Sequence, residues 1–216
     1  MTRSAAWTLP NMLTVARIAI TPVIASLPFI DGYWPKLACF VIFVAAAVTD
    51  VIDGRLARRR NQITDLGKSL DPIADKLLLV ATLGPIWWIT RERQALYDIP
   101  VWGSIPLWVC LLLIGREIAM TVFRAWAQTR GVIIQAENSG KMKAVLQNVF
   151  IGGTLTWFAF RDMVHPLGWE HSRFAAYWHQ FHGGFVAATL GIALTLTIYS
   201  FIAYLIQYRR LFSVGF

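Results

Sequence analysis

Four aspartates stand at regular spacings in one charged segment between two apolar stretches of the chain. Asp50 and Asp53 close the first stretch, and Asp71 and Asp75 open the next. Residues three or four positions apart share one face of a helix, so each pair is expected to present two carboxylates on the same side. Gathered carboxylates repel unless cations neutralise them, and oxygen ligands suit hard divalent ions such as Mg²⁺ or Mn²⁺. The spacing therefore predicts a divalent metal site that a phosphate group completes.

The composition indicates what surrounds these acids. Hydrophobic residues make up 56% of the 216 residues, and the mean hydropathy is +0.53, which excludes an ordinary soluble domain. A helix that crosses about 30 Å of hydrocarbon needs roughly 20 apolar residues. The expected fold is all-α: a polytopic membrane protein of one domain, 1–216, with a short N-terminal interfacial segment at 7–17. Its six transmembrane helices are expected at residues 13–30, 37–54, 72–90, 102–123, 144–160 and 183–206.

The first apolar run is expected to stay in the protein as a helix. A signal-peptide core is short and uncharged, whereas Arg17, Pro22 and Pro28 interrupt this run. Pro10 suits the first turn of a helix, and Trp7 suits the level of the lipid headgroups.

Lysine and arginine divide unevenly between the two sides of the six spans. Twelve fall on the side that holds residues 1–12, 54–70, 124–143 and 207–216, and five on the side that holds 31–36, 90–101 and 161–182. The richer side is expected to be cytoplasmic, which predicts a multi-pass protein of the bacterial inner (cytoplasmic) membrane with both termini and the aspartates facing the cytoplasm. This bias and attraction to anionic lipid explain the net charge of +8, and no nucleic-acid partner is expected.

The four acids are expected at about the same depth in the membrane. Asp50 lies about 20 Å along the second span, and Asp71 is expected to cap the third, with Pro72 in its first turn. Asp65 is expected in the solvated loop between them. A capping role would explain Asp71, and an ion pair with Lys76 or Arg55 could explain one more acid. These structural roles do not explain all four. Ionisable groups at membrane depth are costly and usually functional.

The segment from Asp50 to Asp75 resembles the signature of the CDP-alcohol phosphatidyltransferase family at every defined position. The resemblance implies a six-helix membrane enzyme, usually a homodimer, that carries two divalent metals and uses a CDP-linked lipid as donor. It implies that Asp75 is also the general base. It further implies a metal-ligand set of Asp50, Asp53, Asp71 and Asp75, and a CDP-binding set of Gly54, Ala57, Arg58 and Gly67.

The acceptor is expected to carry a phosphate. Arg116 falls about 20 Å from the outer end of the fourth span, level with the aspartates. Arg124 follows it, and Lys141 and Lys143 precede the fifth span, so cations converge from two helices, which suits a phosphate ligand. The alternative for Arg116 is a structural ion pair with Glu117 or with one of the aspartates.

Two short motifs point to one branch of the family. Both motifs are most similar to those of bacterial phosphatidylglycerophosphate synthases. The first is the N-terminal stretch LPNMLTVARIAITPVI, and the second is GRE at 115–117 followed by GKMK at 140–143 and Gln147. This resemblance implies transfer of the phosphatidyl group from CDP-diacylglycerol to sn-glycerol 3-phosphate, which gives phosphatidylglycerophosphate and CMP, within membrane lipid. The alternatives are a sister transferase that uses inositol phosphate, serine or another phospholipid, and a divalent-cation transporter. A transporter is disfavoured because the acids cluster at one face and no internal repeat is seen.

The cysteines and histidines carry little functional signal. Cys39 and Cys110 lie inside apolar spans and are expected to be small core residues. Interfacial polar positions are expected for the histidines, and a metal pair at His179 and His182 is the minor alternative. These two and the remaining histidines, His165 and His171, all lie on or next to the 161–182 connection. The sequence suggests no function for this connection.

Overall fold

Helices account for nearly all of the chain that the computed structural model describes, which is residues 8–59, 65–99, 103–132 and 138–209. No side chain is described at 53–59, 65, 66, 68, 69, 95, 138–141 and 170. The long helices are α1 (Leu9–Ser26), α2 (Tyr33–Arg59), α3 (Asp65–Glu92), α5 (Leu107–Thr129), α6 (Asn138–Val164) and α7 (Arg173–Gln207). Three short elements join them: η1 (Leu27–Phe29), α4 (Gln94–Tyr97) and η2 (Trp169–His171).

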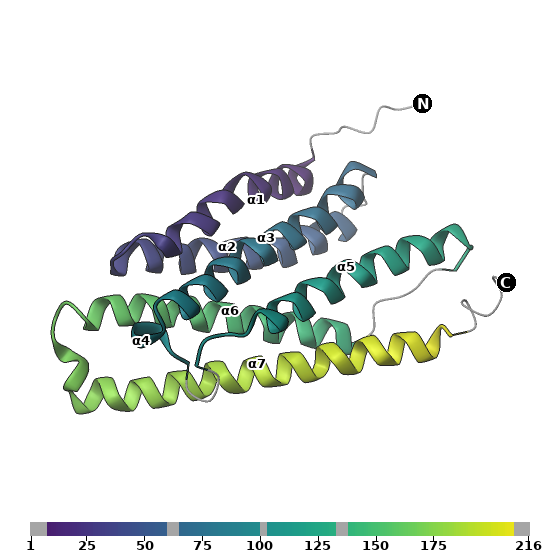
Figure 1. Ribbon diagram of the computed structural model, residues 1–216. Coiled ribbons are helices and arrows are strands. Elements are labelled where there is room, and N and C mark those ends of the chain that lie inside the picture. The colour runs from purple at the N-terminus through teal and green to yellow at the C-terminus, as the bar shows by residue number, and fades with distance from the viewer. Residues whose placement is uncertain (1–7, 60–64, 100–102, 133–137, 210–216) are drawn as a thin grey trace.

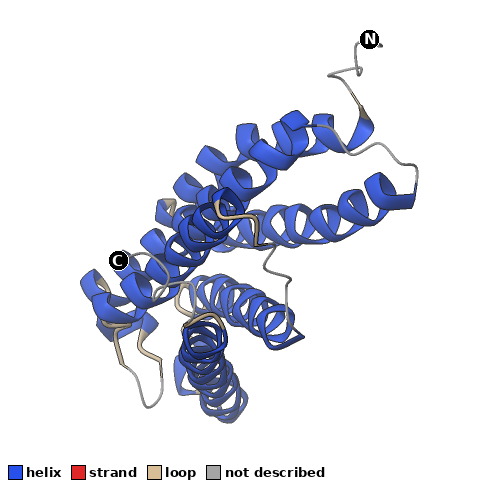
Figure 2. Ribbon diagram, turned by 90° about the vertical axis from the view of Figure 1, so that its right-hand side faces the viewer, coloured by secondary structure: helices blue, strands red, loops and turns tan. Residues whose placement is uncertain are grey.

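The long helices run side by side as an elongated bundle (Figure 1). α1 packs on α3 and α2, α2 packs on α6, and α6 packs on α7, while α5 bridges α3 and α7. Figure 2 shows helices throughout the described chain, with one isolated backbone bridge between Ile99 and Gly103. The expected all-α fold is confirmed for these residues. We call the end where α2 finishes and α3 begins the acidic end, and the end with the α1–α2 and α6–α7 turns the opposite end.

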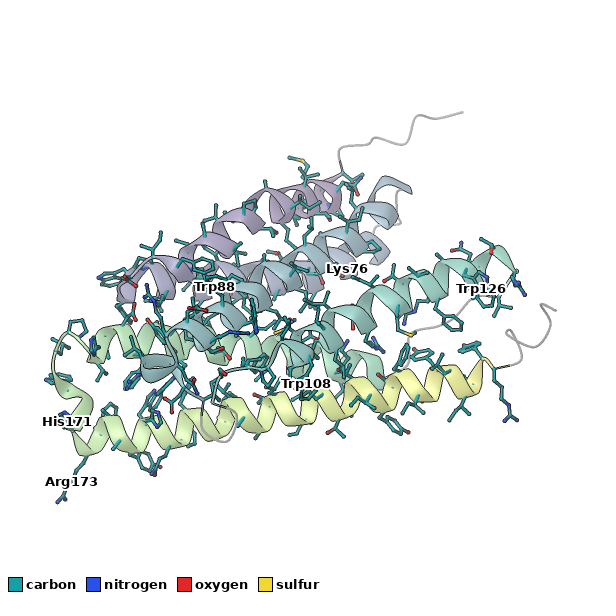
Figure 3. The ribbon with its side chains drawn as sticks, viewed as in Figure 1. Lys76, Trp88, Trp108, Trp126, His171 and Arg173 are labelled. Atoms are coloured by element: carbon teal, nitrogen blue, oxygen red, sulfur yellow. The ribbon has the colours of Figure 1, made fainter. Side chains whose placement is uncertain are left out.

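Four of these helices are long and apolar enough to cross a membrane. The stretches are Leu9–Phe29, Tyr33–Ile52, Leu70–Glu92 and Arg173–Gln207. Trp88 and Trp108, labelled in Figure 3, keep half or more of their surface exposed although they are apolar. Many other large apolar side chains are also exposed. Surfaces of this kind are expected where helices face lipid instead of water. The protein therefore has the character of a membrane protein.

The helices extend further than the apolar runs predicted. α6 continues to Val164 and α7 begins at Arg173, so the expected long connection at 161–182 is wrong and spans only 165–172. Hydropathy reports the apolar length of a span, while a helix continues through its polar ends until its backbone bonding stops. The stretch 9–17 is likewise the first half of α1, with Pro10 in its first turn as expected, and Trp7 lies outside the described residues.

The start of α3 overturns two further expectations. The helix begins at Asp65, so Asp65 belongs to its first turn and not to the loop. Asp71 and Pro72 lie inside the helix, so Asp71 is not its cap.

A buried ion pair joins three elements at the opposite end. The Lys36 ammonium on α2 pairs with the Asp162 carboxylate on α6, and the two side chains are 1% and 7% exposed. Asp162 also accepts hydrogen bonds from the Tyr97 hydroxyl of α4 and from the Gly32 N–H, the latter at 2.7 Å. Gly32 has φ +113°, a backbone conformation that favours glycine. We call Lys36, Tyr97 and Asp162 the opposite-end cluster.

Candidate active site

The inward face of α1 is polar. Its buried residues include Asn11, Thr14, Arg17 and Thr21, spaced three or four apart, so they form one stripe along the helix. In a membrane protein such a stripe faces the bundle interior because lipid cannot hydrogen-bond to it. The spacing of these polar residues by three or four positions is visible in the sequence and predicts such a stripe. From the sequence, however, Arg17 was used only as an argument against a signal peptide.

Arg17 brings two of the predicted metal ligands together. Its guanidinium Nη1 lies 2.5 Å from Asp50 Oδ1 and 3.6 Å from Asp75 Oδ1, so these two carboxylate oxygens are at most about 6 Å apart. Arg17 itself is 1% exposed, whereas the Asp50 and Asp75 side chains are 40% and 56% exposed. The cation is therefore buried behind two carboxylates whose other sides are open.

Asp71 joins the same site through a second residue of α1. The Thr14 hydroxyl donates a hydrogen bond of 2.8 Å to Asp71 Oδ1. Lys76, the neighbour of Asp75 that is labelled in Figure 3, instead donates to the Pro72 carbonyl of its own helix at 2.9 Å. The cation within 4 Å of both Asp50 and Asp75 therefore comes from α1, and Lys76 adds a longer-range electrostatic attraction to Asp75.

The acid cluster suits a hard divalent ion in its chemistry. Among the side chains that the structure describes, no three of His, Cys, Asp and Glu gather closely enough to hold a metal ion, and the Asp53 side chain lies outside that set. Asp50, Asp71 and Asp75 nevertheless offer oxygen donors alone, at one end of the bundle, and two of them are half open. Oxygen-only sets of this kind fit Mg²⁺ or Mn²⁺ better than softer metals.

The residues expected around CDP follow Asp50 along the helix. Gly54, Ala57 and Arg58 belong to the last turns of α2, and their side-chain surroundings lie outside the described residues. Gly67 is buried in the first turn of α3.

A second charged cluster lies between α5, α6 and α7. The Arg116 guanidinium reaches Glu117 Oε1 at 3.0 Å and Ser200 Oγ at 3.0 Å, and Lys143 pairs with the same Glu117 oxygen. Arg116 and Lys143 side chains are 8% and 2% exposed, and Glu117 is 30% exposed. This is the Glu117 pair foreseen as the alternative for Arg116, although one acid here faces two buried cations. We call these four residues the basic cluster.

Of the other two predicted acceptor residues, only Arg124 has a described side chain. The Arg124 guanidinium lies over the Tyr204 ring, 5.9 Å from its centre, and the Lys141 side chain lies outside the described residues. Lys143 is the α6 cation that is buried in the basic cluster, and it lies on the same face of α6 as the buried Gln147 and Thr154. Arg124 is close enough to Lys76 on α3 to interact with it electrostatically, which places the basic cluster's helix beside the acid cluster's helix.

The cysteines and histidines have ordinary structural places. Cys39 and Cys110 are buried free thiols. His182 Nε2 donates to the Gly153 carbonyl at 2.7 Å, and His179 lies 3.5 Å from Asp98. Each of these two histidines therefore has its own partner on another helix or turn.

The geometry defines a class of protein: a helical membrane protein whose clustered carboxylates suit a divalent cation. A family profile makes this specific, because the profile of the CDP-alcohol phosphatidyltransferases matches residues 7–199. The chain belongs to this family, which is generally dependent on divalent cations.

The similar proteins carry two different named activities. A cardiolipin synthase (CMP-forming) from Oryza sativa subsp. japonica is 38% identical over 65% of this chain and 43% of its own length. A CDP-diacylglycerol–glycerol-3-phosphate 3-phosphatidyltransferase from Arabidopsis thaliana is 37% identical over 66% of this chain and 61% of its own. One of the same name from Bacillus subtilis is 31% identical over 68% and 76%. The match thus spans about two fifths to three fifths of these plant relatives.

Proposed function

We propose that the protein transfers the phosphatidyl group of CDP-diacylglycerol to sn-glycerol 3-phosphate, giving phosphatidylglycerophosphate and CMP. The observation that carries the proposal is the acid cluster, in which Arg17 draws together Asp50 and Asp75 while both carboxylates stay half-exposed. The family of the chain and the named activity of its Arabidopsis and Bacillus relatives support this choice of reaction and substrates.

Four aspartates would hold the metals. In the proposal Asp50, Asp53, Asp71 and Asp75 hold two divalent ions, Mg²⁺ or Mn²⁺, and Gly54, Ala57, Arg58 and Gly67 surround the CDP moiety. When bound, such ions neutralise the diphosphate and make CMP a better leaving group.

The protein's own groups do the remaining work. Asp75 takes the proton of the acceptor hydroxyl while that oxygen bonds to phosphorus and the phosphorus–oxygen bond to CMP breaks. Thr14 and Arg17 hold Asp71, Asp50 and Asp75 in place, so that the carboxylates are oriented before the substrates arrive. One displacement suffices, and no covalent enzyme intermediate is required.

The basic cluster is the proposed acceptor site. Arg116 and Lys143 bring two buried cations to one partly exposed Glu117, and an acceptor phosphate would supply the missing negative charge. Arg124 and Lys141 complete the acceptor site as proposed from the sequence. A guanidinium recognises phosphate through paired donors, which favours glycerol 3-phosphate over an uncharged alcohol.

A second candidate is transfer to a phospholipid acceptor. The rice relative, named cardiolipin synthase (CMP-forming), favours it. Both reactions release CMP and need the same acid cluster, so only the acceptor distinguishes them.

The proposed setting is the bacterial inner membrane. Six transmembrane helices, among them α5 and α6, would place the acidic end and both termini in the cytoplasm, and two chains would form a homodimer. Twelve lysines and arginines at the acidic side against five at the other support this orientation.

The test is CMP release by the purified protein in detergent with CDP-diacylglycerol, Mg²⁺ and a panel of acceptors. We expect release with glycerol 3-phosphate, and none in a metal-free control. Arg116→Gln should raise the apparent KM for the acceptor about tenfold to a hundredfold, the value of a charge-assisted contact of about 1.5–3 kcal/mol, with the donor KM little changed. The exposed Arg209→Gln is the matched control. Release with phosphatidylglycerol alone would establish the second candidate, and no release with any acceptor would disprove both.

A further inference from the structure

One carboxylate oxygen in the basic cluster faces both buried cations. Glu117 Oε1 lies 3.0 Å from Arg116 Nη1 and also accepts from the Lys143 ammonium. The two cations belong to different helices, α5 and α6, and they converge on this single atom. A phosphate that both cations hold must therefore place an oxygen where Glu117 Oε1 now lies. The carboxylate and an acceptor phosphate compete for one position.

Arg116 has an anchor that does not depend on Glu117. Its Nη2 donates to Ser200 Oγ on α7 at 3.0 Å, and the Ser200 hydroxyl donates in turn to the Thr197 carbonyl at 3.2 Å. Ser200 is fully buried, so water does not compete for these bonds. The guanidinium is therefore still held in place when Glu117 moves away.

Arg116 also has a donor that Glu117 does not use. Among the residues that the structure describes, its buried Nε finds no hydrogen-bond acceptor. Such groups are rare in native proteins because an unmade buried hydrogen bond is costly. A guanidinium presents its N–H groups as a planar fork that fits two phosphate oxygens at once. A phosphate can therefore replace the bond to Glu117 and satisfy Nε as well.

Glu117 is the member of the cluster that can move. Its side chain is 30% exposed, whereas those of Arg116 and Lys143 are 8% and 2% exposed. The carboxylate can rotate toward the surface, and it would be repelled by a phosphate placed beside it. Glu117 is the only acidic residue in the sequence of α5, so no second acid on that helix takes its place.

We propose that Glu117 is a specificity-determining residue, which neutralises the basic cluster in the resting protein and is replaced by the acceptor phosphate. The proposal rests on the proposed function, because it takes the acceptor to bind at this cluster. A phosphate monoester carries about 1.5–2 negative charges at pH 7, which matches Arg116 and Lys143 together better than one carboxylate does. A phosphodiester carries one charge and gains little by the exchange. Glu117 therefore favours phosphate monoesters as acceptors.

The first experiment measures CMP release by Glu117→Gln. The amide keeps the size of the side chain but no longer competes as an anion, so the apparent KM for glycerol 3-phosphate should fall about tenfold, which corresponds to about 1.4 kcal/mol. The KM for the donor should not change. The methyl ester of glycerol 3-phosphate, a phosphodiester, should become a measurable acceptor. Glu92→Gln, an exposed position at the end of α3, makes the same change of charge and should behave as wild type.

A purely structural role of Glu117 predicts the opposite result. If the carboxylate serves to orient Arg116, Glu117→Gln should raise the KM for glycerol 3-phosphate, and this result would overturn the proposal. An unchanged KM would also overturn it, because the carboxylate would then stay in place beside the acceptor. The double variant Glu117→Gln with Lys143→Met should lose the gain and have a KM above that of wild type, since one of the two competing cations is gone.

A second experiment follows phosphate binding without turnover, through melting curves in increasing inorganic phosphate. Glu117→Gln should melt below wild type, because two buried cations lose their counter-ion. Phosphate should restore its melting temperature at a concentration about tenfold lower than the one that stabilises wild type. Chloride at equal ionic strength is the control for screening. A phosphate response in Glu117→Gln that is no stronger than in wild type would overturn the proposal.

A milder variant keeps the test decisive if the glutamine variant does not fold. Glu117→Asp retains the charge on a shorter side chain that reaches the two cations less well, so it should lower the KM for glycerol 3-phosphate severalfold; a higher or unchanged KM would contradict the proposal. Failure of the wild-type protein to release CMP with any acceptor is a different outcome, which removes the proposed function itself. The phosphate dependence of the melting temperatures would then decide the role of Glu117.

Discussion

A buried cation meets a carboxylate from another helix at both ends of this bundle, yet the two ends differ in what the carboxylate can still do. At the opposite end Asp162 is 7% exposed and accepts from Lys36, Tyr97 and the Gly32 N–H. At the acidic end Asp50 and Asp75 share Arg17 and keep 40% and 56% of their side-chain surface open. The first arrangement is saturated, and the second retains oxygen atoms that can bind a ligand.

The surroundings of Tyr97 support the structural role of the opposite-end cluster. Burial, and the hydrogen bond to Asp162, raise the pKa of the Tyr97 phenol well above its usual range. The phenol therefore stays neutral and remains a donor at every working pH. Lys36 also donates to the Tyr97 oxygen at 2.8 Å, so each member of the cluster is bonded to the other two. Charge alone therefore does not mark a functional site; charge with open ligand positions does.

The largest expected effect is on activity, at the acidic end. Asp71→Asn keeps the size of the side chain, and Thr14 can still donate to the amide oxygen, but the metal loses a charged ligand. Metal stabilisation of a transition state is worth several kcal/mol, so CMP release should fall about a thousandfold at about 1.4 kcal/mol per tenfold. The melting temperature should hardly change. A variant that keeps more than about a tenth of the wild-type rate would place Asp71 outside the metal site.

The next largest effect is on stability, at the opposite end. Lys36→Met leaves Asp162 buried without its cation, which costs about 3–5 kcal/mol and should lower the melting temperature by about 10 °C for a chain of this size. Activity per folded molecule should stay at the wild-type level, as measured by CMP release at low temperature.

The double variant Lys36→Met with Asp162→Leu is the control for that prediction. Replacing both members of a buried pair by apolar groups is often neutral, so it should recover much of the lost stability. A large loss of activity in the single variant at full folding would contradict a purely structural role.

Local spacing explains why the sequence predicted one end of the molecule better than the other. Asp50 and Asp53, and Asp71 and Asp75, are neighbours along helices, so periodicity alone places each pair on one face. Lys36 and Asp162 are 126 positions apart, and Arg17 and Asp50 are 33 apart. No spacing rule connects such residues, because the packing of α1 and α6 on α2 decides which of them meet.

The helices themselves were predictable because lipid imposes a long apolar run on each span. Their ends were not, since Asp65 and Arg173 lie in helical turns beyond the apolar stretches. The basic cluster was predictable in part: Arg116 was identified from its depth, whereas burial of Lys143 depends on how α6 is rotated against α5, which the sequence does not state.

A smaller effect compares the two buried cations directly. Arg17→Met should lower the melting temperature by less than half as much as Lys36→Met, because the half-open Asp50 and Asp75 can regain water where Asp162 cannot. Added Mg²⁺ should then raise the melting temperature of Arg17→Met, since a ligand held about a hundredfold above its Kd adds about 2.7 kcal/mol. Equal losses in the two methionine variants, with no response to Mg²⁺, would show that the acidic end is as closed as the other.

The smallest effect belongs to an exposed ion pair near the opposite end, Asp31 with Arg93, whose side chains are 73% and 46% exposed. The hydrogen bond from Arg93 holds the pKa of the Asp31 carboxyl below its ordinary value of 3.8. A carboxyl with a lowered pKa stabilises the fold above its ordinary pKa, and this contribution disappears as the pH falls through the lowered value. Because exposed pairs are worth at most about 1 kcal/mol, Asp31→Asn should lower the melting temperature by only a few degrees at pH 7. The difference from wild type should shrink as the pH falls below the ordinary pKa of 3.8 and vanish once Asp31 is protonated in the folded protein, and it should also shrink in high salt. Arg93→Gln should give the same profile, and the double variant should add nothing, as measured by melting curves across pH. A loss of melting temperature as large as that of Lys36→Met, or one that persists in acid, would contradict this prediction. It would mean that the exposure of an ion pair does not determine how much the pair stabilises this bundle.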